Sequence, residues 1–348
     1  MPKFIVSYFF IILLLISGCH ESSAINDPNE NLNSSENYLF VAGEGSFYEE
    51  NSGSITFINE YGDVTKLEGI GSTVHAVEVY GDYLLVSVNQ DQKILVYNIS
   101  EHGLEFETEV LTGGGSPRDI MIINNKAYFP VWSPDYAVYP LISGHISVLD
   151  LETFSIIESV EVGIMPEGMM YKDGYLWVAN SGGSTISKIN ITNNIVEDSI
   201  EVGNGPRFLV ESNDDIYIAR TAYDENWNPS YGATMISGDD IIIESHSASA
   251  GGACGGSIVA INNKVYRSYN GGIAEIGPDL QIKESTRMGD FNQSYVNHIE
   301  IINNEIYFAI TDFADKNEIE ILDSFGSVIL SHAVGVGPGD FAVWSKFK

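Results

Sequence analysis

Short runs of alternating apolar and polar residues follow one another along the chain, separated by turns rich in Asn, Gly and Asp. The clearest unit covers residues 166–205. Its first two runs, GMMYK and YLWVAN, flank Asp173-Gly174, a pair that favours a tight β-hairpin because both turn positions need positive φ. The runs TISKIN and IVEDSIEVG follow after further polar turns. The unit is therefore predicted to form four short strands, named a to d in chain order.

The same pattern recurs along the chain and can be followed by the turn between strands a and b. An apolar or aromatic residue stands three positions after each turn. Six complete copies have turns that begin at Gly81, Asn124, Asp173, Asn213, Asn262 and Asn303, followed by Leu85, Tyr128, Trp177, Tyr217, Tyr266 and Tyr307. Four-stranded copies about 40 to 50 residues apart are typical of the blades of a β-propeller.

A seventh copy is split between the two ends of the repeat region. Residues 38–71 supply strands b, c and d without a preceding strand a, whereas residues 337–344, GPGDFAVW, supply a strand a with nothing after it. Joining the two removes the exposed faces of the end blades. The sequence thus predicts an all-β fold: one seven-bladed β-propeller over residues 37–348, closed by pairing of the C-terminal strand with the N-terminal blade.

The copies resemble the YVTN-type propeller repeat of bacterial and archaeal surface proteins. LWVANSGGSTISKINITNN at residues 176–194 carries the resemblance best, followed by GHISVLDLETFSIIESVEVG at residues 144–163. Two blades depart from the pattern: the fifth at its strand c, and the sixth by lacking the leading Pro and placing Arg267 in strand b. The resemblance implies a fold and not a chemistry.

The N-terminal segment has the pattern of a signal peptide. Lys3 precedes an apolar run over residues 4–16, which is shorter than a membrane-spanning helix. Ile16-Ser17-Gly18-Cys19 then resembles the lipobox of bacterial lipoproteins, which implies cleavage after residue 18 and a lipid on Cys19. Position 20 is His rather than Asp, which by resemblance to the lipoprotein sorting rule of diderm bacteria favours the outer membrane without fixing the side of it. Residues 19–36 are polar and acidic, so we expect a disordered tether.

The formal net charge of −32 is spread over the blades, which argues against nucleic acid as a partner. The charge can serve solubility, or recruit cations or a basic partner. If Cys19 carries lipid, Cys254 is the remaining cysteine of two, so no disulfide is expected, and its surroundings favour an inert residue. No cofactor motif is present: the Gly-rich segment 248–256 lacks the Gly-Lys-Ser/Thr of a phosphate loop.

Two predicted loops between strands b and c are long and aromatic, at residues 132–143 and 221–231. Such loops share one face of the ring, where binding surfaces are expected. The platform could take a flat or amphipathic ligand, and the alternative is that the loops pack upon themselves. Its candidate ligand-binding residues are Trp132, Tyr136, Tyr139, Tyr223, Trp227 and Tyr231.

The start of each strand a should line the mouth of the central channel. Polar residues stand there in most blades: His75, Arg118, Asp119, Glu167, Arg207, Asn297, His298 and Asp340. A solvated polar ring is one interpretation. The other is ligand contact by Arg118, Asp119, Glu167, Arg207 and Asn297, with the arginines suited to carboxylate or phosphate groups. His75, His298 and Asp340 fall on neighbouring blades and could hold a divalent metal.

We therefore expect a monomeric, lipid-anchored, non-catalytic envelope protein that captures a small molecule, a glycan or an outer-membrane protein partner. It is similar in outline to the surface propeller lipoproteins that pass cobalamin to an outer-membrane transporter. A second hypothesis is a metal-assisted lyase or hydrolase at the channel mouth, loosely similar to the lyase that inactivates streptogramin antibiotics on this fold. A third is a scaffold in an envelope complex.

Overall fold

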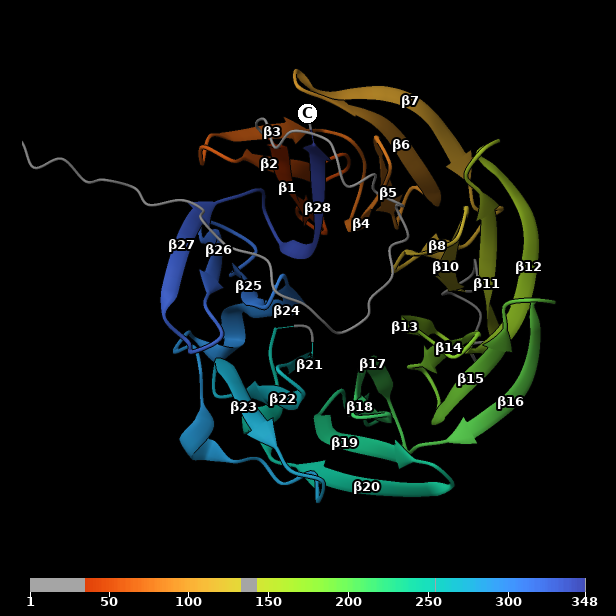
Figure 1. The fold of residues 1–348 in the computed structure, drawn as a ribbon, viewed down its shortest axis with the longest axis vertical. Coiled ribbons are helices and arrows are strands. Elements are labelled where there is room, and N and C mark those ends of the chain that lie inside the picture. Colours follow the sequence, from red (N-terminus) through yellow and green to blue (C-terminus); the bar gives the residue numbers. More distant parts are fainter. Residues whose placement is uncertain (1–34, 133–142, 254, 348) are drawn as a thin grey trace, which may run out of the picture.

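The computed structural model describes residues 35–132, 143–253 and 255–347, and they form a ring of seven antiparallel β-sheets around a central axis (Figure 1). The predicted seven-bladed β-propeller is confirmed. No helix of the described residues is long and apolar enough to cross a membrane. The face on which the inner strands begin is called the top face below. Loops between the second and third strands of each blade also lie there, and the opposite face is called the bottom face.

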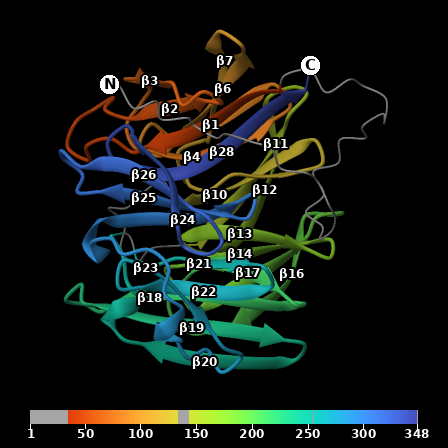
Figure 2. The same cartoon turned by 60° about the vertical axis from the view of Figure 1, so that its left-hand side comes forward.

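Blade 1 closes the ring by joining the two ends of the described chain. From the inside outwards it contains β28 (Pro338–Phe347), β1 (Ser35–Gly43), β2 (Ser54–Asn59) and β3 (Val64–Glu68). In both views β28, blue at the C-terminal end, lies beside the red-orange β1 (Figure 1, Figure 2). Trp344 of β28 is buried, stacks on Tyr38 with ring centroids 5.7 Å apart, and donates through Nε1 to Asp82 Oδ1 of blade 2 at 3.1 Å. This confirms the predicted closure.

The next four blades follow in chain order. Blade 2 contains β4 (Val74–Tyr80), β5 (Tyr83–Val88), β6 (Lys93–Ser100) and β7 (Gly103–Leu111). Blade 3 contains β8 (Ser116–Pro117), β9 (Met121–Ile123), β10 (Lys126–Trp132), β11 (Ser143–Asp150) and β12 (Ser155–Ile164), and its inner strand is divided between β8 and β9. Blade 4 contains β13 (Pro166–Lys172), β14 (Tyr175–Asn180), β15 (Thr185–Asn190) and β16 (Ile195–Glu201). Blade 5 contains β17 (Pro206–Ser212), β18 (Asp215–Tyr223), β19 (Pro229–Ser237) and β20 (Asp240–His246).

Blade 6 is the irregular one, as its weaker match to the repeat suggested. It contains η1 (Ala248–Ala250), β21 (Ile258–Ile261), β22 (Lys264–Tyr269), β23 (Gly272–Ile276) and η2 (Glu284–Thr286). Isolated bridges from Ile273 to Met288 and from Ile276 to Ile282 occupy the place of a fourth strand. Blade 7 contains η3 (Gln293–Tyr295), β24 (Val296–Ile302), β25 (Glu305–Thr311), β26 (Asn317–Leu322) and β27 (Val328–Ala333).

The hydrophobic core lies between the blades. Each of seven clusters of buried side chains joins two neighbouring sheets; one, for example, combines Phe40 and Trp344 of blade 1 with Leu84 of blade 2. The tight turns also have the predicted backbone, because both residues of Asp173-Gly174 and of Asn213-Asp214 have positive φ. Each blade therefore depends on both neighbours for burial, and closure supplies the last interface.

Candidate functional site

Several inner strands place polar residues of different blades at one level because they begin with an irregularity of register. The pairing of inner and second strands shifts between Val74 and Ala76, between Pro206 and Phe208, and between Val296 and His298. The residue skipped by each shift is His75, Arg207 and Asn297 respectively. A β-bulge leaves its extra residue out of the ladder and re-aims its side chain. His75, Arg207 and Asn297 therefore stand at equivalent positions of their blades.

Arg118, Glu167 and Arg207, from blades 3, 4 and 5, form the first connected group. The Nη2 atoms of Arg118 and Arg207 lie 2.5 Å and 3.4 Å from the same oxygen, Glu167 Oε1. The Glu167 side chain is 5% exposed, and those of Arg118 and Arg207 are 13% and 16% exposed. Burial alone would raise the pKa of Glu167, but the two guanidinium groups outweigh it and lower the pKa to about 2. The sequence predicted these residues but not their contact.

Trp132 contacts this group. Its ring lies under the guanidinium of Arg118, 4.2 Å from centroid to Cζ, and its Nε1 donates to the carbonyl oxygen of Pro166 at 2.8 Å. The contact combines a cation–π interaction with packing. Tyr136 and Tyr139 lie outside the described residues, as do Cys19 and Cys254.

Two aspartates of the inner strands hold neighbouring blades together. Asp340 of blade 1 accepts through Oδ2 from the backbone N–H of Val77 in blade 2 at 2.8 Å. Asp119 of blade 3 accepts in the same way from Met169 of blade 4, and also from Ile120. Val77 and Met169 stand at the same distance before their tight turns, so the two contacts are equivalent. Burial raises the pKa of Asp119 to about 6 despite these hydrogen bonds.

Asn297 and His75 are also enclosed. Asn297 Nδ2 donates to the carbonyl oxygen of Pro338 at 2.9 Å and lies 3.5 Å from Glu44 Oε1, which links blade 7 to blade 1. Burial raises the pKa of Glu44. Burial and the positive charge of Arg118 lower the pKa of His75 to about 3, so this imidazole is neutral near pH 7.

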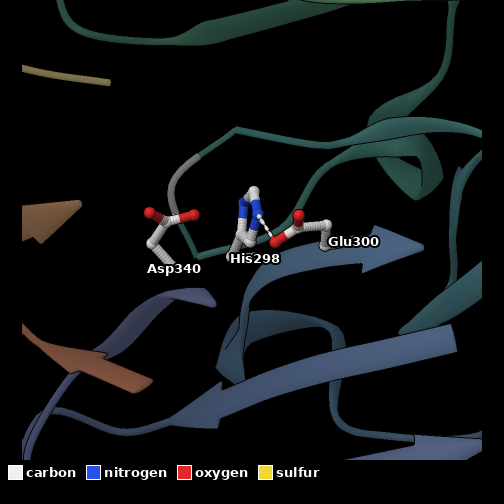
Figure 3. Close-up of side chains that lie close together, drawn as sticks. All are labelled: His298, Glu300 and Asp340. Atoms are coloured by element: carbon white, nitrogen blue, oxygen red, sulfur yellow. Dashed lines mark ion pairs between the residues drawn. The ribbon is translucent and has the colours of Figure 1, made fainter. Parts of the chain in front are cut away.

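His298, Glu300 and Asp340 lie close together deeper in the channel. Figure 3 shows the imidazole of His298 between the two carboxyl groups. His298 Nε2 lies 3.7 Å from Glu300 Oε2, and one potential ligand atom from each residue lies within 4.8 Å of the other two. Two members of the predicted metal trio are thus together, but Glu300 stands where the sequence placed His75. Burial lowers the pKa of His298 and raises those of Glu300 and Asp340.

Sequence reasoning missed Glu300 and its counterpart Glu78. Burial raises the pKa of Glu78 to about 8, and repulsion by Glu300 and Asp119 adds to the effect. A signal was present: both glutamates stand three positions before the tight turn of their blades. Strand alternation did not reveal them because the bulge shifts the inward-facing positions by one residue.

Trp227 and Tyr223 are exposed at the tip of the β18–β19 hairpin on the top face. Trp227 is 81% exposed and Tyr223 is 48% exposed, with ring centroids 6.3 Å apart. Asp224 Oδ1 accepts from the backbone N–H groups of Asn226 and Asn228, both at 2.8 Å, and so fixes the loop. Trp227 has a φ of +63°, which is uncommon for a bulky residue. Tyr231, further down β19, is only partly exposed and pairs with His246 of β20.

A second aromatic pair on the top face was not predicted. Phe47 and Tyr48, in the loop between β1 and β2, are 74% and 93% exposed, and their rings meet edge to face at 5.6 Å. The signal was a pair of adjacent aromatics within a short loop otherwise made of Gly, Ser, Glu and Asn. Blades 1 and 5 lie on opposite sides of the ring (Figure 1), so the two pairs flank the central channel.

Comparison with known proteins supports the fold alone. No protein family matches the sequence, and no curated protein is significantly similar to it. Among solved structures, a protein of unknown function from Desulfotomaculum acetoxidans superposes with a TM-score of 0.62 at 11% identity, covering 89% of this chain and 99% of that one. A putative 6-phosphogluconolactonase from Bacteroides fragilis gives 0.61 at 15% identity, covering 91% and 100%. BamB from Moraxella catarrhalis gives 0.54 at 11% identity, covering 86% and 84%.

Proposed function

We propose that this protein is a lipid-anchored, non-catalytic binding protein of the bacterial cell envelope that captures a ligand on the top face of its propeller. The single observation that carries the proposal is Trp227, a large apolar side chain that is 81% exposed at the tip of an ordered hairpin. Together with Tyr223, whose ring centroid lies 6.3 Å away, Trp227 offers a large contact area with polar tips on the top face.

The loop around Trp227 is suited to recognition because it is already ordered. Asp224 accepts two backbone hydrogen bonds, and a third joins its own backbone N–H to the carbonyl oxygen of Asn228 at 3.1 Å. A preordered loop loses less conformational entropy when a ligand binds. Tryptophan and tyrosine also carry much of the binding energy at protein interfaces. Trp227 and Tyr223 therefore form the centre of the proposed site.

The ligand we favour is large, partly flat and amphipathic, as cobalamin is. The aromatic pairs on blades 1 and 5 would contact its apolar faces. The partly accessible guanidinium groups of Arg118 and Arg207 at the channel mouth would face its polar edges, while the enclosed Glu167 would hold them in place. Glycans share these features in part, because sugar rings stack on aromatic side chains and carry polar groups at their edges. A propeller that docks a protein partner through the same aromatics would fit the fold equally, and it is an outcome of the test below.

The proposed anchor is a lipid on Cys19, based on the lipobox resemblance of residues 16–19. It predicts that the full chain partitions into the detergent phase of a Triton X-114 extract and incorporates labelled palmitate. Cys19→Ser should abolish the label and leave the protein in the aqueous phase. A Cys19→Ser chain that keeps the label would contradict the anchor without affecting the binding site.

Thermal-shift screening of the full chain tests the capture itself, with cyanocobalamin first and then a glycan panel. A ligand that binds only the native state stabilises it in proportion to the logarithm of its concentration over the Kd. Trp227→Ala should remove the shift. Tyr61→Ala is the matched control, because Tyr61 is also 81% exposed but belongs to the turn between β2 and β3 on the bottom face.

Three outcomes are distinguishable. A shift that Trp227→Ala removes and Tyr61→Ala keeps supports the proposal. A shift that both variants keep places the ligand elsewhere and contradicts the site. If no organic compound shifts the transition, but cross-linking of cell envelopes yields a protein partner that depends on Trp227, the scaffold hypothesis replaces capture of a small molecule.

A further inference from the structure

We propose that His298, Glu300 and Asp340 form a binding site for one divalent transition-metal ion inside the channel. The inference goes beyond ligand capture on the top face and does not depend on it. It rests on the position of three potential ligand atoms, one from each side chain, within 4.8 Å of one another (Figure 3). The residues come from β24 of blade 7 and β28 of blade 1, so the site spans the interface between these two blades.

The ligand atoms are close enough for a metal to draw them together. Three atoms no more than 4.8 Å apart can all lie within about 2.8 Å of one point, whereas Zn–N and Zn–O bonds are about 2.0–2.2 Å long. Each atom therefore has to move by less than about 1 Å, which small rotations about side-chain bonds provide.

The three side chains have capacity left for a metal. Asp340 uses Oδ2 to accept from Val77 N–H, which fixes the carboxyl group and leaves Oδ1 for an ion. The Glu300 side chain as a whole is 36% exposed, but its Oε2 oxygen is buried and has no hydrogen-bond partner within the described residues; its contact is with His298 Nε2 at 3.7 Å. A buried carboxylate oxygen without a donor is costly, and coordination to a cation would satisfy it.

Further carboxyl groups near the cluster would attract a cation bound there. Four carboxyl groups, those of Glu78, Asp119, Glu300 and Asp340, influence one another electrostatically at this depth. Within the described parts of the chain, none of them forms an ion pair with a lysine or an arginine. The nearby guanidinium groups of Arg118 and Arg207 lie against Glu167 instead. A divalent cation bound to Glu300 and Asp340 would be the positive partner that these carboxyl groups lack among the described residues, and it would favour their ionised forms.

The donor set indicates the class of metal. One imidazole nitrogen with two carboxylates suits borderline ions such as Zn²⁺, Co²⁺ and Mn²⁺ better than Mg²⁺ or Ca²⁺, which prefer oxygen ligands alone. Three protein ligands leave at least one position for water or another ligand, as in catalytic rather than structural zinc sites. Val77 acts as an outer partner because its N–H orients the Asp340 carboxyl group.

The test uses Co²⁺ as the probe, because its visible absorption reports the ligand geometry directly. The full chain without an affinity tag is purified in detergent, stripped with a chelator and titrated with Co²⁺. We expect one equivalent to bind at micromolar concentrations and Zn²⁺ to displace it. Glu300→Gln and His298→Gln should each weaken binding at least tenfold, because each removes a ligand while nearly preserving volume.

The matched control is His102→Gln. His102 Nε2 lies 3.7 Å from Glu101 Oε1, the same separation as in the proposed site, but its side chain is 87% exposed and the pair lies on an outer turn. This variant should bind Co²⁺ as the wild type does. Circular dichroism establishes that each variant is folded, and if one is not, the other variant and the wild-type stoichiometry decide. The proposal is overturned if the stripped wild type binds no stoichiometric Co²⁺, or if the folded channel variants bind it unchanged.

Discussion

Replacing Glu167 by Gln should destabilise the propeller much more than its small change in shape suggests. The substitution keeps the volume but removes the negative charge that lies between Arg118 and Arg207. Both guanidinium groups are mostly buried, with side chains 13% and 16% exposed, so they cannot be fully hydrated instead. Removing one partner of a buried ion pair typically costs about 3–5 kcal/mol. The residual exposure of the arginines places the expected cost near about 3 kcal/mol.

The lowered pKa of Glu167 leads independently to a similar loss of unfolding free energy. Its value falls from 4.5 to about 2 in the folded protein, because the attraction of the two arginines exceeds the cost of burial. A difference of this size corresponds to about 3 kcal/mol in favour of the ionised folded state. For a propeller of this length, that loss lowers Tm by about 5 °C. Urea unfolding followed by tryptophan fluorescence measures the difference.

Glu211→Gln is the matched control for this substitution. Lys172 Nζ also lies 2.5 Å from its carboxylate partner, Glu211 Oε1, and the pair also joins blades 4 and 5. Glu211 is 39% exposed, however, so this ion pair should contribute less than about 1 kcal/mol to the free energy of unfolding, although its distance is the same. If both variants lose the same unfolding free energy, or if Glu167→Gln loses less than about 1 kcal/mol, the argument from burial is refuted.

Two further predictions concern pH and ring closure. The stabilisation that Glu167 provides should be complete above about pH 4.5 and disappear as the pH falls towards about 2, because a depressed carboxyl pKa stabilises the folded state only while the group is ionised. The difference in unfolding free energy between wild type and Glu167→Gln, measured at several pH values, should therefore shrink as the pH falls through that range. A difference that stays constant would contradict the assignment. Trp344→Ala should lower the free energy of unfolding by about 3–5 kcal/mol, because it empties a buried site between blades 1 and 2 and removes the hydrogen bond to Asp82. The control Phe325→Ala truncates an 87% exposed aromatic side chain and should leave the urea midpoint nearly unchanged. Equal losses of unfolding free energy in the two variants would show that closure does not depend on Trp344.

The sequence alone was enough for the fold because the signals that determine it are local. Alternation of apolar and polar residues defines each strand, and the Asn, Asp and Gly pairs define each tight turn. The split blade followed from counting the strands, because the incomplete copies at the two ends of the repeat region together supply the four strands of one blade. Of the two blades that depart from the repeat pattern, blade 5 forms a regular four-stranded sheet and blade 6 is irregular, with Arg267 fully buried in its second strand and donating to the carbonyl oxygen of Ser257.

The candidate site was only partly accessible to the same reasoning. Equal spacing from the turns identified Arg118, Glu167 and Arg207 as residues at one level of the ring. The spacing did not show that one carboxylate receives both arginines, nor that the ring of Trp132 lies under Arg118. Such contacts depend on the side-chain rotamers and on differences of about an ångström, which strand periodicity does not specify.

The residues of the inner channel show the same division. Spacing placed His298 and Asp340 on neighbouring blades, and the structure confirms that they meet. Only the tertiary structure brings in Glu300 and leaves His75 beside the arginines, because the bulges that begin β24 and β4 change which side chains point inwards. The sequence by itself determined the number of blades and their closure, since these depend on short-range pattern. Which charges face one another across the channel was decided by packing between blades that are distant in the sequence.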